Sequence, residues 1–92
     1  MTTEWTARAR KDLSDTYSFI ARDSESRAKD FCDLLVVGCS HLAKFPFSGA
    51  LVPEDGAYRQ IVVSGYRVVY TITEAGVRIM TVVGPGRGLP GL

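Results

Sequence analysis

The chain of 92 residues carries 11 Lys and Arg against 10 Asp and Glu, a formal net charge of +1. With 46% hydrophobic and 23% charged residues, its composition is typical of one globular domain, and its near-neutral charge gives no general reason to expect nonspecific nucleic-acid binding. The opening stretch MTTEWTARARKDL contains no apolar run that a signal peptide or membrane span needs, so we expect a cytoplasmic protein that does not enter a membrane.

Two amphipathic helices are predicted in the N-terminal half, after a candidate edge strand over residues 2–5. Thr6 is a suitable N-cap for a helix over about 6–22, because its hydroxyl can accept a backbone N–H that has no partner inside the helix. Ser24 begins a second helix over about 24–44, which ends before Pro46 because proline disfavours helical backbone in the residue before it. The short connection between them predicts an antiparallel hairpin.

Three strands are predicted in the C-terminal half, over about 57–63, 66–73 and 77–83. A loop rich in Pro, Gly and Ser precedes them over residues 45–56. Ser64-Gly65 predicts a two-residue hairpin turn, and Gly84-Pro85-Gly86 ends the sheet, leaving a flexible tail over 84–92. The expected fold class is α+β, in which the helical hairpin packs on one face of a small, twisted, mainly antiparallel sheet within a single domain.

The two turns also predict which residues face each other across the sheet. The first turn places Val63 opposite Tyr66. The second places Tyr70 opposite Ile79 and Tyr66 opposite Val83. These residues share one apolar face, which the helices should cover. The opposite face is predicted to hold Tyr58, Gln60, Val62, Arg67, Val69, Thr71, Arg78, Met80 and Val82.

Arginines distinguish the predicted uncovered face from an ordinary amphipathic sheet. Arg67 is expected beside Val82, within an apolar strip that arginines border, and such a surface favours a partner site over scattered surface apolar residues. Arg59 falls on the covered face by strict alternation. Two alternatives remain for it: its side chain extends out at the end of the sheet, or a β-bulge turns it to the other face.

Catalytic and metal-binding motifs are not recognisable in the sequence. Cys32 and Cys39 are seven residues apart on a helix, too far for a disulfide, and are interpreted as core residues. His41, the only histidine, is interpreted as a surface residue. We therefore expect no metal and no cofactor. A nuclease role for Arg67 and Arg87 stays open, since arginine can hold a phosphodiester and stabilise its charge during cleavage.

Four stretches, in this order, resemble the RelE/ParE superfamily of bacterial toxin–antitoxin modules: WTARARKDLSDTYSFIA, LAKFPFSGALVPE, YRQIVVSGYRVVYTI and VRIMTVVGPGR. The resemblance implies two helices on a small twisted sheet and a cognate antitoxin. ParE-like members poison DNA gyrase, whereas RelE-like members cut mRNA in the ribosome. The loop and the Tyr-Arg-x-x-Tyr strand are closer to ParE. Gly84 stands where many relatives have His, and Gln60 where relatives often have Glu, which weakens an acid/base role.

The resemblance leads to three alternative hypotheses: a ParE-like toxin that inhibits gyrase by protein contact, a RelE-like ribosome-dependent mRNA endonuclease, or an inactive antitoxin-binding homologue. It implies target contacts through Arg59, Arg67 and Arg87, although Arg67 could instead be structural and tie the sheet to the tail. We expect a toxin–antitoxin hetero-oligomer. The residues expected to contact the antitoxin are Tyr58, Val62, Arg67, Val69, Arg78, Met80 and Val82.

Overall fold

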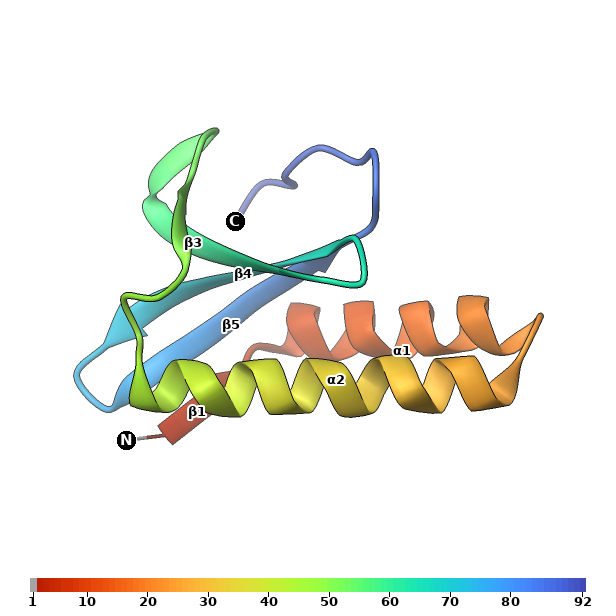
Figure 1. Cartoon of the computed structure of the whole chain (residues 1–92). Coiled ribbons are helices and arrows are strands. Elements are labelled where there is room, and N and C mark those ends of the chain that lie inside the picture. The colour runs from red at the N-terminus through yellow and green to blue at the C-terminus, as the bar shows by residue number, and fades with distance from the viewer. Residues whose placement is uncertain (1) are drawn as a thin grey trace.

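The computed structural model describes residues 2–92, and its elements lie close to the predicted ranges. The helical hairpin packs on one face of a five-stranded sheet (Figure 1), so the predicted fold class is confirmed. A short strand also forms inside the predicted loop. In chain order the elements are β1 (Thr2–Trp5), α1 (Ala7–Ala21), α2 (Glu25–Lys44), β2 (Ala50–Val52), β3 (Asp55–Val63), β4 (Tyr66–Thr73) and β5 (Gly76–Val83).

Both helices begin at the predicted N-caps. The Thr6 hydroxyl accepts a hydrogen bond from the Ala9 N–H at 3.1 Å. The Ser24 hydroxyl accepts one from the Arg27 N–H at 3.2 Å. Each cap satisfies a backbone donor that the first helical turn leaves without a partner, and this fixes where the chain enters the helix.

The strands are ordered β1-β5-β4-β3-β2, and only the β1–β5 pair is parallel. The β3–β4 hairpin turns at Ser64 and Gly65, whose φ angles are 50° and 84°. Two positive φ angles give a turn whose twist matches that of the strands. Val63 therefore lies opposite Tyr66 and Ile61 opposite Val68, which confirms the predicted register of this hairpin.

The predicted register of the β4–β5 hairpin is right at one end and wrong at the other. Tyr70 lies opposite Ile79 as predicted, but a β-bulge follows, and Val83 lies opposite Arg67 instead of Tyr66. One extra residue on β5 inverts the facing of every later side chain. Val82 therefore turns to the helix-covered face, where it is only 6% exposed.

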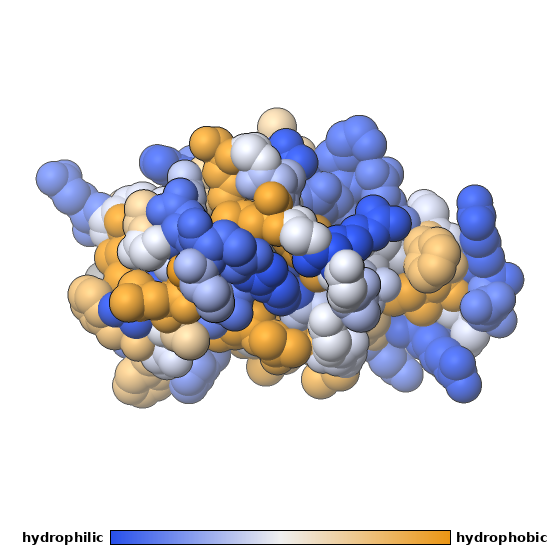
Figure 2. Space-filling model, turned by 90° about the horizontal axis from the view of Figure 1, so that it is seen from above, coloured by the Kyte–Doolittle hydropathy of each residue, from blue (hydrophilic) through white to orange (hydrophobic). Residues whose placement is uncertain are grey.

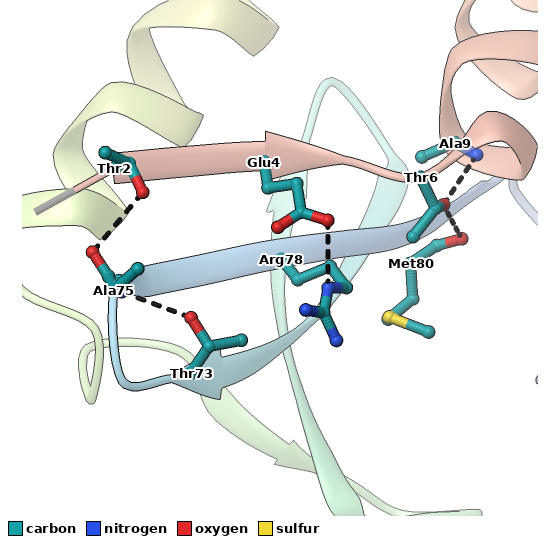
Figure 3. A network of polar contacts seen from close by, with 9 residues as sticks. Thr2, Glu4, Thr6, Ala9, Thr73, Ala75, Arg78 and Met80 are labelled. Atoms are coloured by element: carbon teal, nitrogen blue, oxygen red, sulfur yellow. Dashed lines mark hydrogen bonds and ion pairs between the residues drawn. The ribbon is translucent and has the colours of Figure 1, made fainter.

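The bulge falls where β1 ends and α1 begins. The Thr6 N–H donates to the Ile79 carbonyl, and the Thr6 hydroxyl donates to the Met80 carbonyl at 3.1 Å (Figure 3). Beyond this point β5 has no strand on its outer side. Asp12 of α1 accepts hydrogen bonds from the Val82 N–H and the Thr81 hydroxyl instead. A side chain thus closes the sheet edge that β1 leaves open.

The core lies between the helices and the sheet. Cys39 is buried, as predicted, and burial raises the pKa of its thiol to about 11. Cys32 is half-buried and His41 is exposed. The Phe31 ring packs on the Tyr66 ring, with the ring centroids 4.8 Å apart. The buried cluster comprises Ala9, Phe31, Leu35, Cys39, Leu42, Val68, Tyr70, Val77, Ile79 and Val82.

Candidate functional site

The face of the sheet turned away from the helices, called the second face below, is less open than the sequence predicts. Val69 is 0% exposed on it, although the helices lie on the other side. The C-terminal tail lies on this side of the sheet, where it curves back above β4 (Figure 1). Leu89 and Pro90 of the tail are half-buried, while Pro85 to Gly88 are exposed. The side chains of this face include Gln60, Val62, Arg67, Val69, Thr71, Arg78, Thr81 and Val83.

Arg67 lies on the second face, as predicted, but it is held by residues of its own chain. Its two terminal nitrogens donate to the two carboxylate oxygens of Glu54, both at 2.8 Å. Its Nε donates to the Gln60 amide oxygen at 2.7 Å. A two-pronged Arg–carboxylate pair fixes orientation as well as charge. The guanidinium of Arg67 lowers the pKa of the Glu54 carboxyl to about 2.

Glu54 also connects Arg67 to the tail. A backbone hydrogen bond from Leu89 contributes to the lowered pKa of the Glu54 carboxyl. The sequence left open that Arg67 ties the sheet to the tail, and Glu54 is the residue between them. Seen from the tail side, the molecule has apolar surface crossed by a band of hydrophilic residues (Figure 2). That surface is more polar and more internally paired than a free apolar strip.

Arg59 lies on the helix side of the sheet, opposite Tyr70, as strict alternation predicts. No β-bulge turns it to the other face; its side chain reaches the loop before β2 from the middle of β3. The guanidinium donates to the Gly49 carbonyl at 2.8 Å and lies 5.2 Å from the centroid of the Phe47 ring. Arg59 therefore holds the loop before β2, on the opposite face from Arg67.

The remaining predicted residues are spread over the molecule. Arg78 is paired with Glu4 of β1, Nε to Oε1, at 3.2 Å (Figure 3). Arg87 is exposed in the tail, while Tyr58 and Met80 are half-buried. Hence Arg59 and Arg67, which lie on opposite faces of the sheet, do not converge on one point. The described residues 2–92 hold no group of three or more His, Cys, Asp or Glu placed to bind a metal.

Two hollows in the surface were not identified from the sequence. A groove of about 920 Å³ lies between α1, α2 and β1, with Trp5, Leu13 and Val36 in its wall. Its lining includes Arg10 and Glu4 together with several hydroxyl side chains, so it shows no preference for one ligand charge. A second hollow of about 510 Å³ lies between α1, the end of β5 and the tail. Sequence periodicity predicts which face of an element a residue lies on, but it does not predict the cavities that form between packed elements.

The loop between α2 and β2 holds side-chain contacts that the sequence did not predict. The Tyr70 hydroxyl donates to the Pro46 carbonyl at 2.6 Å and accepts from the Gly49 N–H at 3.0 Å. A Cβ on Gly49 would lie 2.5 Å from that hydroxyl oxygen, so only glycine fits. Phe47 nevertheless remains 70% exposed. These hydrogen bonds fix the loop to Tyr70, and the loop in turn holds the exposed side chain of Phe47.

Comparison with known proteins identifies the family. The sequence matches the family described as "ParE toxin of type II toxin-antitoxin system, parDE" over residues 3–87. The chain belongs to the ParE toxin family. Its fold is similar to a chain of the "Chromosomal ParDE TA system from P. aeruginosa", with a TM-score of 0.78 and 18% identity over 92% of this chain and 96% of that chain. No curated protein matches the sequence.

Family membership confirms the resemblance to ParE within the RelE/ParE superfamily. The similar ParDE structure agrees with the fold of two helices on a mainly antiparallel sheet. Among the residues that the structure describes, no helix is both long and apolar enough to cross a membrane.

Proposed function

We propose that this ParE-family chain acts in the cytoplasm as a toxin that inhibits DNA gyrase by protein contact, and that a cognate antitoxin neutralises it in a toxin–antitoxin hetero-oligomer. One observation favours protein contact over RNA cleavage. Arg67, the leading candidate for holding a phosphodiester, already spends three donors on Glu54 and Gln60. A nuclease needs cations free to meet the charge that develops during cleavage.

The positions of the other candidates support the same proposal. Arg59 points to the helix side of the sheet and donates to a backbone carbonyl, so it does not share a pocket with Arg67. His41, the only histidine, lies on α2 and stacks on Phe45. General acid–base catalysis requires its proton donors and acceptors within reach of one reacting group. This chain spreads them over separate surfaces.

A supercoiling assay with purified DNA gyrase tests the proposal. We expect the purified toxin at micromolar concentration to inhibit supercoiling, and the product of the adjacent small reading frame to relieve the inhibition and to co-purify with the toxin. Primer extension on translated mRNA is the counter-test. Ribosomal A-site cleavage that disappears in Arg67→Ala would replace the proposal with the RelE-like hypothesis. Absence of growth arrest on expression would instead favour an inactive antitoxin-binding homologue.

A further inference from the structure

The second half of α2 and the loop after it form the most apolar exposed surface of the described chain. Between Leu34 and Pro53 the sequence contains no Asp or Glu. This segment supplies six of the ten large hydrophobic residues that are exposed. Exposed apolar surface concentrated in one region marks an interaction site more often than scattered residues do. We define the α2 flank as Leu34, Val37, His41, Phe45, Phe47 and Leu51.

The residues of the α2 flank share one side of the molecule. Leu34, Val37, His41 and Phe45 follow one another at helical spacing, so they form a stripe on α2. A Cβ on Gly38 would lie 3.3 Å from the Ile61 side chain, which shows that α2 meets β3 beside this stripe. The stripe on α2 and the adjoining edge of the sheet therefore meet at an angle and form an open corner, called the step below.

The sheet side of this step is only partly covered by the helices. Leu51 lies opposite Arg59 in the β2–β3 ladder and so faces the helix side, yet it is 56% exposed. Ile61 and Val63 face the same side and are only half-buried. The hairpin of two helices thus leaves the outer strands β3 and β2 without a full layer beneath them. An additional element alongside α2 would complete the layer.

The charged side chains at the Lys44 end of the α2 flank are basic, whereas Asp30 and Asp33 lie on α2 before Leu34. In the described residues 2–92, neither Lys44 nor Arg59 has an ion-pair partner, and the pairs that form involve other cations. Two cations among five apolar side chains are too few for a nucleic-acid surface, whose affinity comes from many phosphate contacts.

We propose that the α2 flank binds an acidic amphipathic helix of a partner protein, which lies along α2 as a third helix beneath β3 and β2. The apolar face of that helix packs against the stripe and the adjoining edge of the sheet, and its carboxylates meet Lys44 and Arg59. Phe47, held rigid by its loop, is the anchor that a partner pocket receives. The identification of this partner with the antitoxin rests on the proposed function. The binding of an acidic helix at the α2 flank does not depend on whether gyrase is the target.

Two valines of equal exposure allow a matched test. Val37 on the α2 flank is 67% exposed and Val62 on the second face is 64% exposed, so a serine costs a similar small amount of stability at each. The probe is a synthetic helix of Leu and Glu, about 18 residues long because shorter helices are marginal in water. Fluorescence anisotropy should show saturable binding that Val37→Ser and Phe47→Ser each weaken by about tenfold. Val62→Ser should leave the affinity unchanged.

The controls decide between the proposed partner and its alternatives. The same peptide with Lys in place of Glu should not bind. Equal binding of the two peptides, or equal loss of affinity in Val62→Ser and Val37→Ser, would overturn the proposal, and so would a dimer of the toxin that Val37→Ser dissociates. Circular dichroism establishes that each variant is folded. Peptide binding at the α2 flank without gyrase inhibition would reject the proposed target and leave this inference standing.

Discussion

The second face of the sheet and the α2 flank both carry apolar and cationic groups, but their cations are paired differently. On the second face, Arg67 is paired with Glu54, and Val69 is fully buried. On the α2 flank, no carboxylate follows Leu34 until Glu54, and Phe47 is 70% exposed. An exposed cation therefore does not by itself identify a binding surface. The cation is available to a partner only where no carboxylate of the same chain is already paired with it.

The largest expected loss of stability comes from disrupting the contact between Tyr70 and the loop that carries Phe47 of the α2 flank. Gly49→Ala places a Cβ 2.5 Å from the Tyr70 hydroxyl and 2.8 Å from the Gln60 carbonyl oxygen, so buried groups must move. We expect the free energy of unfolding to fall by about 3 kcal/mol, measured by urea denaturation. Gly56→Ala is the matched control, because nothing lies within 4 Å of its added Cβ. Equal stability of the two variants would show that the loop is loose.

The next effect tests the closure of the second face. Val69→Ala removes two methyl groups from a side chain that is 0% exposed, and we expect a loss of about 2 kcal/mol. Val62→Ala, on the neighbouring strand of the same face, is 64% exposed and should change stability little. Thermal unfolding of both variants measures the difference. Similar small losses would mean that the Val69 side chain is not buried.

A smaller effect concerns the edge of β5. Asp12→Ala removes the acceptor for the Val82 N–H and the Thr81 hydroxyl, both of which then lack a partner at a covered edge. We expect a loss of about 1 kcal/mol in denaturant unfolding. Asp15→Ala on the same helix removes only the exposed pair with Lys11 and should cost less. A greater loss from Asp15→Ala would contradict this reading of the bulge.

The smallest expected effect is a pH dependence of the free energy of unfolding, which comes from the pair of Glu54 and Arg67 on the second face. The pKa of the Glu54 carboxyl is about 2 in the folded chain, against an ordinary value of 4.5. A lowered folded pKa means that the stabilisation is fully present above pH 4.5 and is lost as the pH falls toward 2. The stability difference between the wild type and Glu54→Gln should shrink over this window, as followed by urea unfolding. Glu74 is exposed, so Glu74→Gln serves as the control and should keep the wild-type dependence of stability on pH. If Glu54→Gln also kept the wild-type dependence, the result would argue against the pair between Glu54 and Arg67.

Local patterns in the sequence predict most of the fold. Thr6 and Ser24 begin the two helices, and Ser64-Gly65 sets the register of the β3–β4 hairpin. These are short-range features, in which each residue acts on neighbours a few positions away. The β-bulge in β5 is different, because it depends on Thr6 and Asp12, which are about 70 residues away in the chain. Strict alternation therefore put Val82 on the wrong face.

The candidate surfaces were predicted less well than the fold, for a related reason. The sequence identified Arg67 as an exposed cation but could not show that Glu54, in a loop, would neutralise it. It gave no sign that Leu89 of the tail would hydrogen-bond Glu54, because Gly and Pro give no regular pattern from which such a contact can be predicted. The one available sign of the α2 flank was the run from Leu34 to Pro53 without a carboxylate.

The contrast between the two surfaces can be measured directly in solution with valine methyl NMR and a soluble paramagnetic agent. Val37 and Val62 should broaden strongly, because both side chains are more than half exposed, whereas Val69 and Val83 are buried and should be sheltered. That result would support a second face that is closed at Val69 and Val83 but open at Val62 on β3, beside an open α2 flank. Methyl signals of Val69 and Val83 that broaden as strongly as Val62 would show that the second face is open over β4 and β5 as well, and would contradict the account.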